Sequence, residues 1–531
     1  MTLPFLLSAL IFLPLLAGAF VLLLGEDENP AFARGTALAV SVANMLLSLV
    51  LLAPSLRFEE KLPWLPQFGI GYHLRVDGLS LWLILLVTFM TPAAILASWK
   101  LIQSRAKVYY GCMLLLSGGM VGVLCAMDLF LFYVFWEIML IPAFFLVGAY
   151  GTGNARATTM KFVIYTMVGS LLMLVGVVFA GYQHFAATGV WTFDLAALYG
   201  QAYAATGVTG AAISSVGHWA FLAFVSAFVI KAAMFPLHTW LPDTYTDAPA
   251  PVTFMLSAVM AKLGIYGILR LAIPLFPDAA RDFGPFFIGL AVIGVIYGAL
   301  VALVQEDAKR MIAYASISHL GIITMAVFTT SPQAVSGAVL HMIAHALTTG
   351  ALFLLIGFLY ERKGTTMIAA YGGITKTIPV FATVFLLVTL ASVGLPGLAG
   401  FVGEFMIFLG AFRDHSTAAT IATISVILGA SYMLWMFQRT MFGPLTATEN
   451  TRLPDMNGRE LTIFVPMVLL IIFIGVYPQA LLARINPAVT SYLSLTRPAP
   501  SRPFHGATTA PAVQPAAAPH ATEAAHGAGG H

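Results

Sequence analysis

Four ionisable side chains lie within long apolar segments of the sequence. They are Glu137, Lys231, Lys262 and Glu404. If each segment crosses a lipid bilayer, a lysine or acidic side chain near its middle costs roughly 2.5 to 3.5 kcal/mol unless it is paired or hydrated. Charges that are kept inside a membrane usually mark the path of an ion or a proton. These four residues are therefore the first candidates for a function.

Three histidines extend this set of titratable groups. His319 lies in the segment AYASISHLG, and His341 and His345 are four residues apart, on one face of a helix. Imidazoles exchange protons near neutral pH, and the same spacing suits a metal ion. A zinc site needs further ligands, which neither an HExxH motif nor a cysteine pair supplies. We predict a proton relay and no metal; for each histidine the alternative is a structural hydrogen bond across a helix interface.

Two of the charged residues lie beside breaks in their predicted helices. Pro236 follows Lys231 by five residues and removes a backbone donor from that helix. In LASVGLPGLAGFVGEF, three glycines and a proline interrupt a second helix, and Glu404 follows about one turn after the last glycine. Broken helices at matching places in two halves of a chain are typical of transporters with inverted repeats, although proline and glycine are also common in ordinary membrane helices.

The composition predicts an all-α polytopic membrane protein of about 14 transmembrane helices. Of 531 residues, 60% are hydrophobic and 9% are charged, and the mean hydropathy is +0.92, whereas about a quarter of the residues of a soluble domain are charged. We expect N-terminal helices 1–3 over 1–107, a first five-helix repeat over 108–273, a second, inverted repeat over 274–442, a last transmembrane helix with its flanks over 443–496, and a disordered tail rich in Ala, Pro and His over 497–531.

The charged residues and cysteines exclude several other functions. A net charge of +3 with scattered basic residues does not favour nucleic acid. Cys112 and Cys125 are too far apart for haem attachment or an iron–sulfur motif, so we expect no redox cofactor in this chain.

Arg270 lies near the end of its predicted helix, where we expect it to extend toward the membrane surface. Lys and Arg are more numerous in the connections on one side, which predicts that both termini are outside an inner (cytoplasmic) membrane.

Five segments together resemble the antiporter-like proton-translocating subunits of respiratory complex I. The segments are FWEIMLIPAFFL, KAAMFPLHTWLPDTYTDAPAPV, AKLGIYGILR, QEDAKRMIAYASISHLG and LPGLAGFVGEF, and the similarity covers about residues 70 to 480. The resemblance implies a proton path composed of Glu137 and Lys231 as an interacting pair, Lys262 as the central relay, His319 and His345 as intermediate carriers, Glu404 as the far end, and His238 and His341 as possible further relays.

The resemblance also implies partners. The neighbouring antiporter-like subunits L and N usually carry Lys where this chain has Glu404, and lipids surround the chain. FMN, iron–sulfur clusters and quinone are expected in partner subunits that oxidise NADH and reduce quinone.

Movement of Glu137 toward or away from Lys231 would change how tightly the lysine holds its proton, which is a candidate pumping switch.

Three other functions compete with this interpretation. The chain could be a subunit of an Mrp-type cation/proton antiporter that is not coupled to redox chemistry. It could also be a membrane subunit of a hydrogenase complex, in which the same module receives electrons from a different donor. A purely structural anchor predicts that neutralising all four intramembrane charges leaves proton pumping intact.

Overall fold

Long apolar runs form most of the helices, because in a bilayer every backbone polar group must be satisfied within its own segment. The computed structural model describes residues 5–25, 30–54, 58–199, 211–445 and 448–496, so the predicted tail lies outside the described residues. Within the described part, eleven helices are long and apolar enough to cross a membrane, and three shorter apolar helices accompany them. The count of fourteen and the inverted repeats stay predictions.

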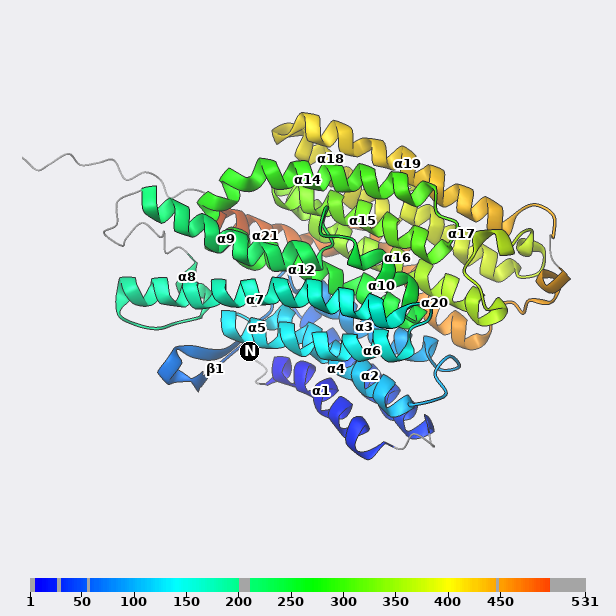
Figure 1. Ribbon diagram of the computed structural model, residues 1–531, viewed down its shortest axis with the longest axis horizontal. Coiled ribbons are helices and arrows are strands. Elements are labelled where there is room, and N and C mark those ends of the chain that lie inside the picture. Colours follow the sequence, from blue (N-terminus) through cyan, green and yellow to red (C-terminus); the bar gives the residue numbers. More distant parts are fainter. Residues whose placement is uncertain (1–4, 26–29, 55–57, 200–210, 446–447, 497–531) are drawn as a thin grey trace, which may run out of the picture. The chain divides into compact units, whose positions relative to one another are not determined.

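Most of these helices lie roughly side by side (Figure 1). The helices of the N-terminal half are α1 (Leu6–Leu24), α2 (Pro30–Ser48), α3 (Leu81–Ala97), α4 (Ala106–Cys125), α5 (Leu129–Ile138), α6 (Leu140–Tyr150), α7 (Ala155–Thr188), α8 (Leu195–Leu198), α9 (Ala211–Lys231), α10 (Trp240–Asp247), α11 (Ala250–Met255), α12 (Ala261–Gly267) and α13 (Ile273–Leu275). Those of the C-terminal half are α14 (Pro277–Leu303), α15 (Ala308–Val327), α16 (Pro332–Lys363), α17 (Pro379–Val393), α18 (Ala399–Asp414), α19 (Ser416–Met441), α20 (Gly458–Val476) and α21 (Gln479–Thr496).

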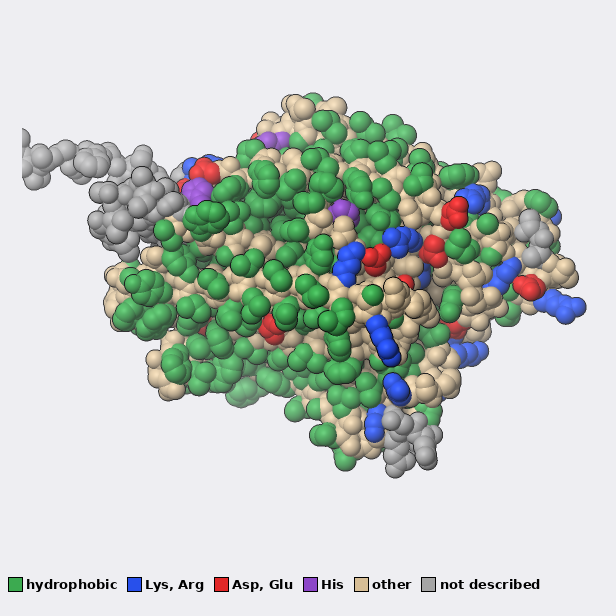
Figure 2. All heavy atoms as spheres, in the orientation of Figure 1, with side chains coloured by type: hydrophobic (Ala, Val, Ile, Leu, Met, Phe, Trp, Pro, Cys, Tyr) green, Lys and Arg blue, Asp and Glu red, His purple; other side chains and the backbone are tan. Residues whose placement is uncertain are grey.

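The outer surface of the bundle is apolar over much of the face drawn in Figure 2. Hydrophobic side chains cover its middle, and most of the Lys and Arg side chains visible there lie toward one end of the helices, on the right. An apolar belt with charges at its margin is the surface that a bilayer requires.

Both helix breaks predicted from the sequence are present. Helix α9 ends at Lys231, and the chain turns before α10 begins at Trp240. Helix α17 ends at Val393, and Gly394 then takes a left-handed backbone conformation with φ of +85° before α18 begins at Ala399. Glycine tolerates this conformation because it has no Cβ.

The helix that carries Lys262 is irregular on both sides of it. Two π-helical segments, η4 (Leu256–Met260) and η5 (Ile268–Ala272), flank α12. Helix α12 packs directly on α9, since a Cβ at Gly264 would lie 2.5 Å from the carbonyl oxygen of Phe228. This close approach holds the two lysine-bearing helices against each other.

A short β-hairpin, β1 (Glu59–Leu65) and β2 (Ile70–Arg75), stands outside the helices and was not predicted from the sequence. His73 fastens it to the α7–α8 connection: its Nδ1 lies 3.0 Å from Oδ2 of Asp194, and its Nε2 lies 2.9 Å from Oε1 of Glu59. Lys61 donates to the same oxygen of Asp194 at 2.6 Å. In Figure 1, β1 and α8 lie at the same end of the helices.

This attachment should weaken as the pH rises. Burial opposes the charged imidazole, but the hydrogen bonds to Asp194 and Glu59 outweigh it and raise the pKa of His73 above its usual value of 6.5. A raised pKa adds stability that is complete below about pH 6.5 and is lost as the pH rises through the folded-state pKa. At pH 6 we expect the hairpin of the wild type to be cleaved by proteases more slowly than that of His73→Gln, and we expect the two cleavage rates to converge in alkali. The ratio of the two cleavage rates is measured at each pH. A ratio that does not change with pH would contradict a role for the charged imidazole.

Candidate functional site

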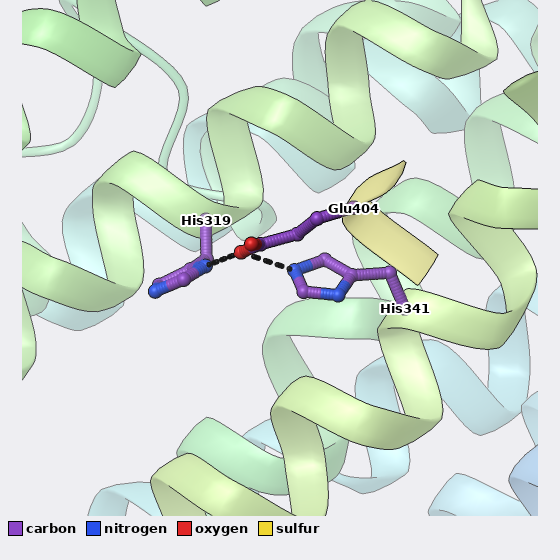
Figure 3. A group of neighbouring side chains, drawn as sticks. All are labelled: His319, His341 and Glu404. Carbon is purple, nitrogen blue, oxygen red and sulfur yellow. Dashed lines mark ion pairs between the residues drawn. The ribbon is translucent and has the colours of Figure 1, made fainter. Parts of the chain in front are cut away.

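A carboxylate and two imidazoles from three helices meet inside the C-terminal half. Glu404 on α18 places Oε1 at 2.9 Å from Nδ1 of His319 on α15 and at 3.5 Å from Nε2 of His341 on α16 (Figure 3). Glu404 and His341 are buried, and His319 is nearly so. Each contact is an ion pair when the histidine is protonated, so a proton on either ring is stabilised by the same carboxylate.

Small residues allow the helices of this cluster to approach. A Cβ at Gly403 would lie 2.6 Å from the Cβ of His341, so α18 packs backbone to backbone on α16 beside the carboxylate. On the other side, a Cβ at Gly394 would lie 3.0 Å from Oε2 of Glu404. The break between α17 and α18 therefore makes room for the carboxylate, which an uninterrupted helix would not.

His345 is a third histidine close to the rings of His319 and His341. Its ring centroid lies 5.0 Å from that of His319 and 6.1 Å from that of His341, and both of its ring nitrogens are buried without a hydrogen-bond partner among the described residues. Buried polar atoms normally have partners, and an unpaired one needs an explanation such as a water or a proton-carrying role. Three imidazoles at this spacing can pass a proton if water fills the gaps.

Lys262 adds a buried positive charge near these rings. Its Nζ donates to the carbonyl oxygen of Ser257 in η4, and its charge acts on both His341 and His345. The side chain is fully buried, and the described residues offer it no carboxylate within ion-pair distance. An unpaired buried ammonium is costly, and a neutral lysine would avoid that cost.

Lys231 and Glu137 are the two other intramembrane charges of the N-terminal half. Nζ of Lys231 is buried and sits 5.0 Å from the ring centroid of Trp136, which attracts a cation electrostatically. The charge of Glu137 acts on Lys231, but the two side chains form no ion pair among the described contacts, and Oε1 of Glu137 is buried without a hydrogen-bond partner there. Glu137 and Lys231 are thus neighbours, as expected, but their side chains do not form an ion pair.

Two other residues differ from the sequence analysis in their surroundings. His238, a possible relay, is not in the cluster: its ring stacks on Phe235 and meets the edge of Tyr297. Arg270, expected to extend toward the membrane surface, has an acidic partner that the sequence did not indicate. Its guanidinium is buried and donates two hydrogen bonds of 2.7 Å to Asp77, because a bidentate carboxylate offsets the cost of burying the charge.

The sequence analysis missed several polar residues around Glu404. Tyr432 on α19 is buried and interacts electrostatically with Glu404. Three serines join it and His319 around a cavity of about 10 Å³, close to the smallest volume that holds one water molecule. The serines are Ser318, Ser392 and Ser425. Such residues are common in membrane helices, so no pattern in the sequence distinguishes these from structural ones.

The same cluster is also the group that best fits a metal ion. The ligand atoms of His319, His341 and Glu404 all lie within 4.8 Å of one another. Three donors are fewer than the four that structural zinc takes, and the imidazole and carboxylate already pair with each other. Proton exchange between these groups uses the geometry as it stands, whereas a metal would require the donors to move closer together.

Apolar membrane helices, two of them broken, that enclose a line of lysine, histidine and glutamate define an antiporter-like membrane subunit. Residues 126–476 match the family model described as "NADH:quinone oxidoreductase/Mrp antiporter, TM". The chain belongs to this family.

The comparisons with individual proteins place the chain in the complex I branch of the family. It is 40% identical to NADH-quinone oxidoreductase subunit M of Rhodobacter capsulatus, over 91% of this chain and 95% of the relative. It is 36% identical to NADH-ubiquinone oxidoreductase chain 4 of Marchantia polymorpha, over 91% and 96%. A chain of respiratory complex I from Thermus thermophilus superposes with a TM-score of 0.83 at 31% identity, over 93% of this chain and all of that one. A chain of the Mrp complex from Dietzia sp. shares the fold, with a TM-score of 0.78 at 21% identity.

Proposed function

We propose that this chain is a proton-translocating subunit of the membrane arm of complex I, in the position that subunit M or chain 4 has in its relatives. The observation that carries the proposal is the contact of the buried Glu404 with two histidines from other helices, one buried and one nearly so. A buried carboxylate shared by two imidazoles is costly as a purely structural feature, because apolar residues would fill the same space at less cost. It is useful where a proton must be held and passed on.

The proposed path runs from Glu137 and Lys231 through Lys262 and the three histidines to Glu404. Three of its steps join groups that interact in the structure: Glu137 with Lys231, Lys262 with His345, and Glu404 with His319. The step from Lys231 to Lys262 is proposed across the packed interface between α9 and α12. Moving one charge against about 150 mV requires roughly 3.5 kcal/mol, from about 2.3 kcal/mol per 100 mV. Rearranging one buried ion pair changes the energy by a similar amount, about 3 to 5 kcal/mol, so such a switch is adequate for the load.

The energy for pumping would come from partner subunits. In this proposal they hold FMN, iron–sulfur clusters and quinone, the neighbours are subunits of the L and N type, and the chain spans the inner membrane with both termini outside. The strong similarity to complex I chains favours redox coupling over an Mrp-type antiporter, whose likeness extends only to the fold. Copurification with an NADH-oxidising arm would separate complex I from a hydrogenase complex.

Glu404 provides the direct test of the proposed function. In the assembled complex, Glu404→Gln should lower NADH-driven proton pumping about tenfold, equivalent to about 1.4 kcal/mol, because an amide cannot take up a proton. Glu404→Asp should retain part of the activity. Glu404→Lys is a subtler variant, since it imitates the L and N subunits and tests whether either type of titratable group suffices.

The measurement is the number of protons transported per NADH oxidised in sealed vesicles. The matched control is Glu449→Gln, which makes the same chemical change at an exposed residue in a connection between helices. A normal ratio in Glu404→Gln, with the complex fully assembled, would exclude Glu404 from the path and leave the cluster as structural.

A further inference from the structure

A polar pocket lies where the β-hairpin, the start of α3 and helix α21 meet. Its volume is about 320 Å³, within the roughly 300 to 1,000 Å³ of small-molecule sites. Its polar lining comes from Arg75, Arg484, Glu59 and Asp77, and its apolar lining includes Leu51, Phe58 and Leu81. The pocket lies apart from the line of intramembrane charges, and the proposed proton path does not use it.

The two carboxylates of this pocket are already engaged. Asp77 accepts two hydrogen bonds from Arg270, and Glu59 is bonded to His73 although it lies opposite Arg75 in the β-ladder. Among the residues that the structure describes, no carboxylate lies within ion-pair distance of Arg75 or Arg484. The charge of Arg75 nevertheless acts on Asp77. The pocket therefore holds Arg75 and Arg484 without a direct ion pair, beside two carboxylates that other groups also engage.

Close backbone packing fixes one of these arginines. A Cβ at Gly78 would lie 1.9 Å from the carbonyl oxygen of Arg484, so α21 sits directly on the backbone at the start of α3. Nη2 of Arg484 donates to the carbonyl oxygen of Leu52 at 3.3 Å. One of the five N–H donors of the guanidinium is used in this way, and the others remain for a ligand.

The pocket is at the margin of the apolar surface. The apolar segment Pro30–Leu52 ends beside it, and Leu81 in its wall begins α3. Leu46, Leu49 and Leu52 on the adjoining segment are exposed. An amphipathic ligand could thus place its polar group in the pocket and its hydrocarbon along these leucines, at the depth where lipid headgroups lie.

We propose that this pocket binds the phosphate group of an anionic phospholipid whose acyl chains lie along the end of α2. Arginine matches phosphate geometry with two parallel hydrogen bonds. With Arg270, three guanidinium groups face the two carboxylates of the pocket, which leaves one positive charge for the single negative charge of a phosphodiester and suits an acidic headgroup better than a zwitterionic one. A free phosphate ion has the same polar chemistry but would leave the leucines uncovered. A carboxylate of a neighbouring subunit is the competing occupant.

The test uses the complete complex, purified and placed in nanodiscs with photoactivatable phosphatidylglycerol. Cross-linked peptides are identified by mass spectrometry. We expect labelling of the segments around Leu49 and Arg484, competed by unlabelled phosphatidylglycerol but not by phosphatidylcholine or by millimolar inorganic phosphate. Arg75→Gln with Arg484→Gln should lower the labelling at least about tenfold, since both substitutions remove charge-assisted hydrogen bonds to the phosphate.

The control pair is Arg281→Gln with Arg413→Gln. It removes the same total charge from two exposed positions outside the pocket and should leave the labelling unchanged. Unaltered labelling in the pocket variant, or equal labelling by the zwitterionic lipid, would overturn the proposal. Competition by inorganic phosphate would identify a free-anion site instead of a lipid site. Absence of labelling at the pocket in the complete complex would also overturn the proposal.

Discussion

Lys262→Met should abolish most proton pumping through this chain, with a loss of at least about tenfold in the assembled complex. Lys262 is buried between the charges of the N-terminal half and the histidine cluster, and its own charge acts on His341 and His345. Methionine keeps an unbranched side chain of similar length, so packing is preserved while the exchangeable proton is lost. Removing an unpaired buried charge should not weaken folding.

A second variant separates proton transfer from simple electrostatics. Lys262→Arg keeps the positive charge, but a guanidinium does not release its proton in proteins, so pumping should fail here as well. The control is Lys376→Met, which alters an exposed lysine in a connection. Proton-to-electron ratios in sealed vesicles, with NADH oxidation measured in parallel, decide the matter. Full pumping in Lys262→Arg would mean that Lys262 contributes only its positive charge and does not transfer a proton.

Glu137→Gln and Lys231→Ala should each lower pumping about tenfold, and the double variant should be no worse than the more damaged single one. The two side chains act on each other through their charges without forming an ion pair, so neither retains its effect when the other is neutral. This non-additivity corresponds to a coupling energy of about 1.4 kcal/mol.

The double-mutant cycle needs all four complexes to assemble with comparable NADH-oxidising arms. The indole of Trp136, 5.0 Å from Nζ of Lys231, should be left in place, since it contacts the lysine in every member of the cycle that retains it. Losses that simply add would show that the two residues act independently and would remove the switch from the mechanism.

The membrane helices and their breaks could be predicted because their causes are local. Proline removes a donor wherever it stands, and a glycine at φ of +85° ends α17 by its own conformation. The β-hairpin could not be predicted in this way, since its strands are short and mixed in polarity and depend on His73 meeting Asp194, 121 residues away. The ion pair of Arg270 could not be predicted for the same reason, because its partner Asp77 is 193 residues distant.

The candidate site was predictable in its residue types but not in its geometry. An ionisable residue in an apolar segment is visible without a structure, so Glu404 and the lysines stood out. Which side chains meet depends on how helices pack. His341 therefore gained a contact with Glu404 that its sequence did not indicate, while His238 lay apart with aromatic neighbours. Tyr432 carries no local signal at all.

The π-helical segments around Lys262 have a consequence for chain length. A π turn takes up about one residue more than an α turn, so each of the segments Leu256–Met260 and Ile268–Ala272 rotates the following side chains by about 100° relative to an uninterrupted α-helix. A helical wheel drawn at a constant period therefore misplaces the residues Ile273–Leu275, which follow η5, relative to Lys262. Conversely, deleting one residue within either segment would restore an ordinary α turn while the rest of the helix kept its register, so this span can lose a residue where a regular helix cannot.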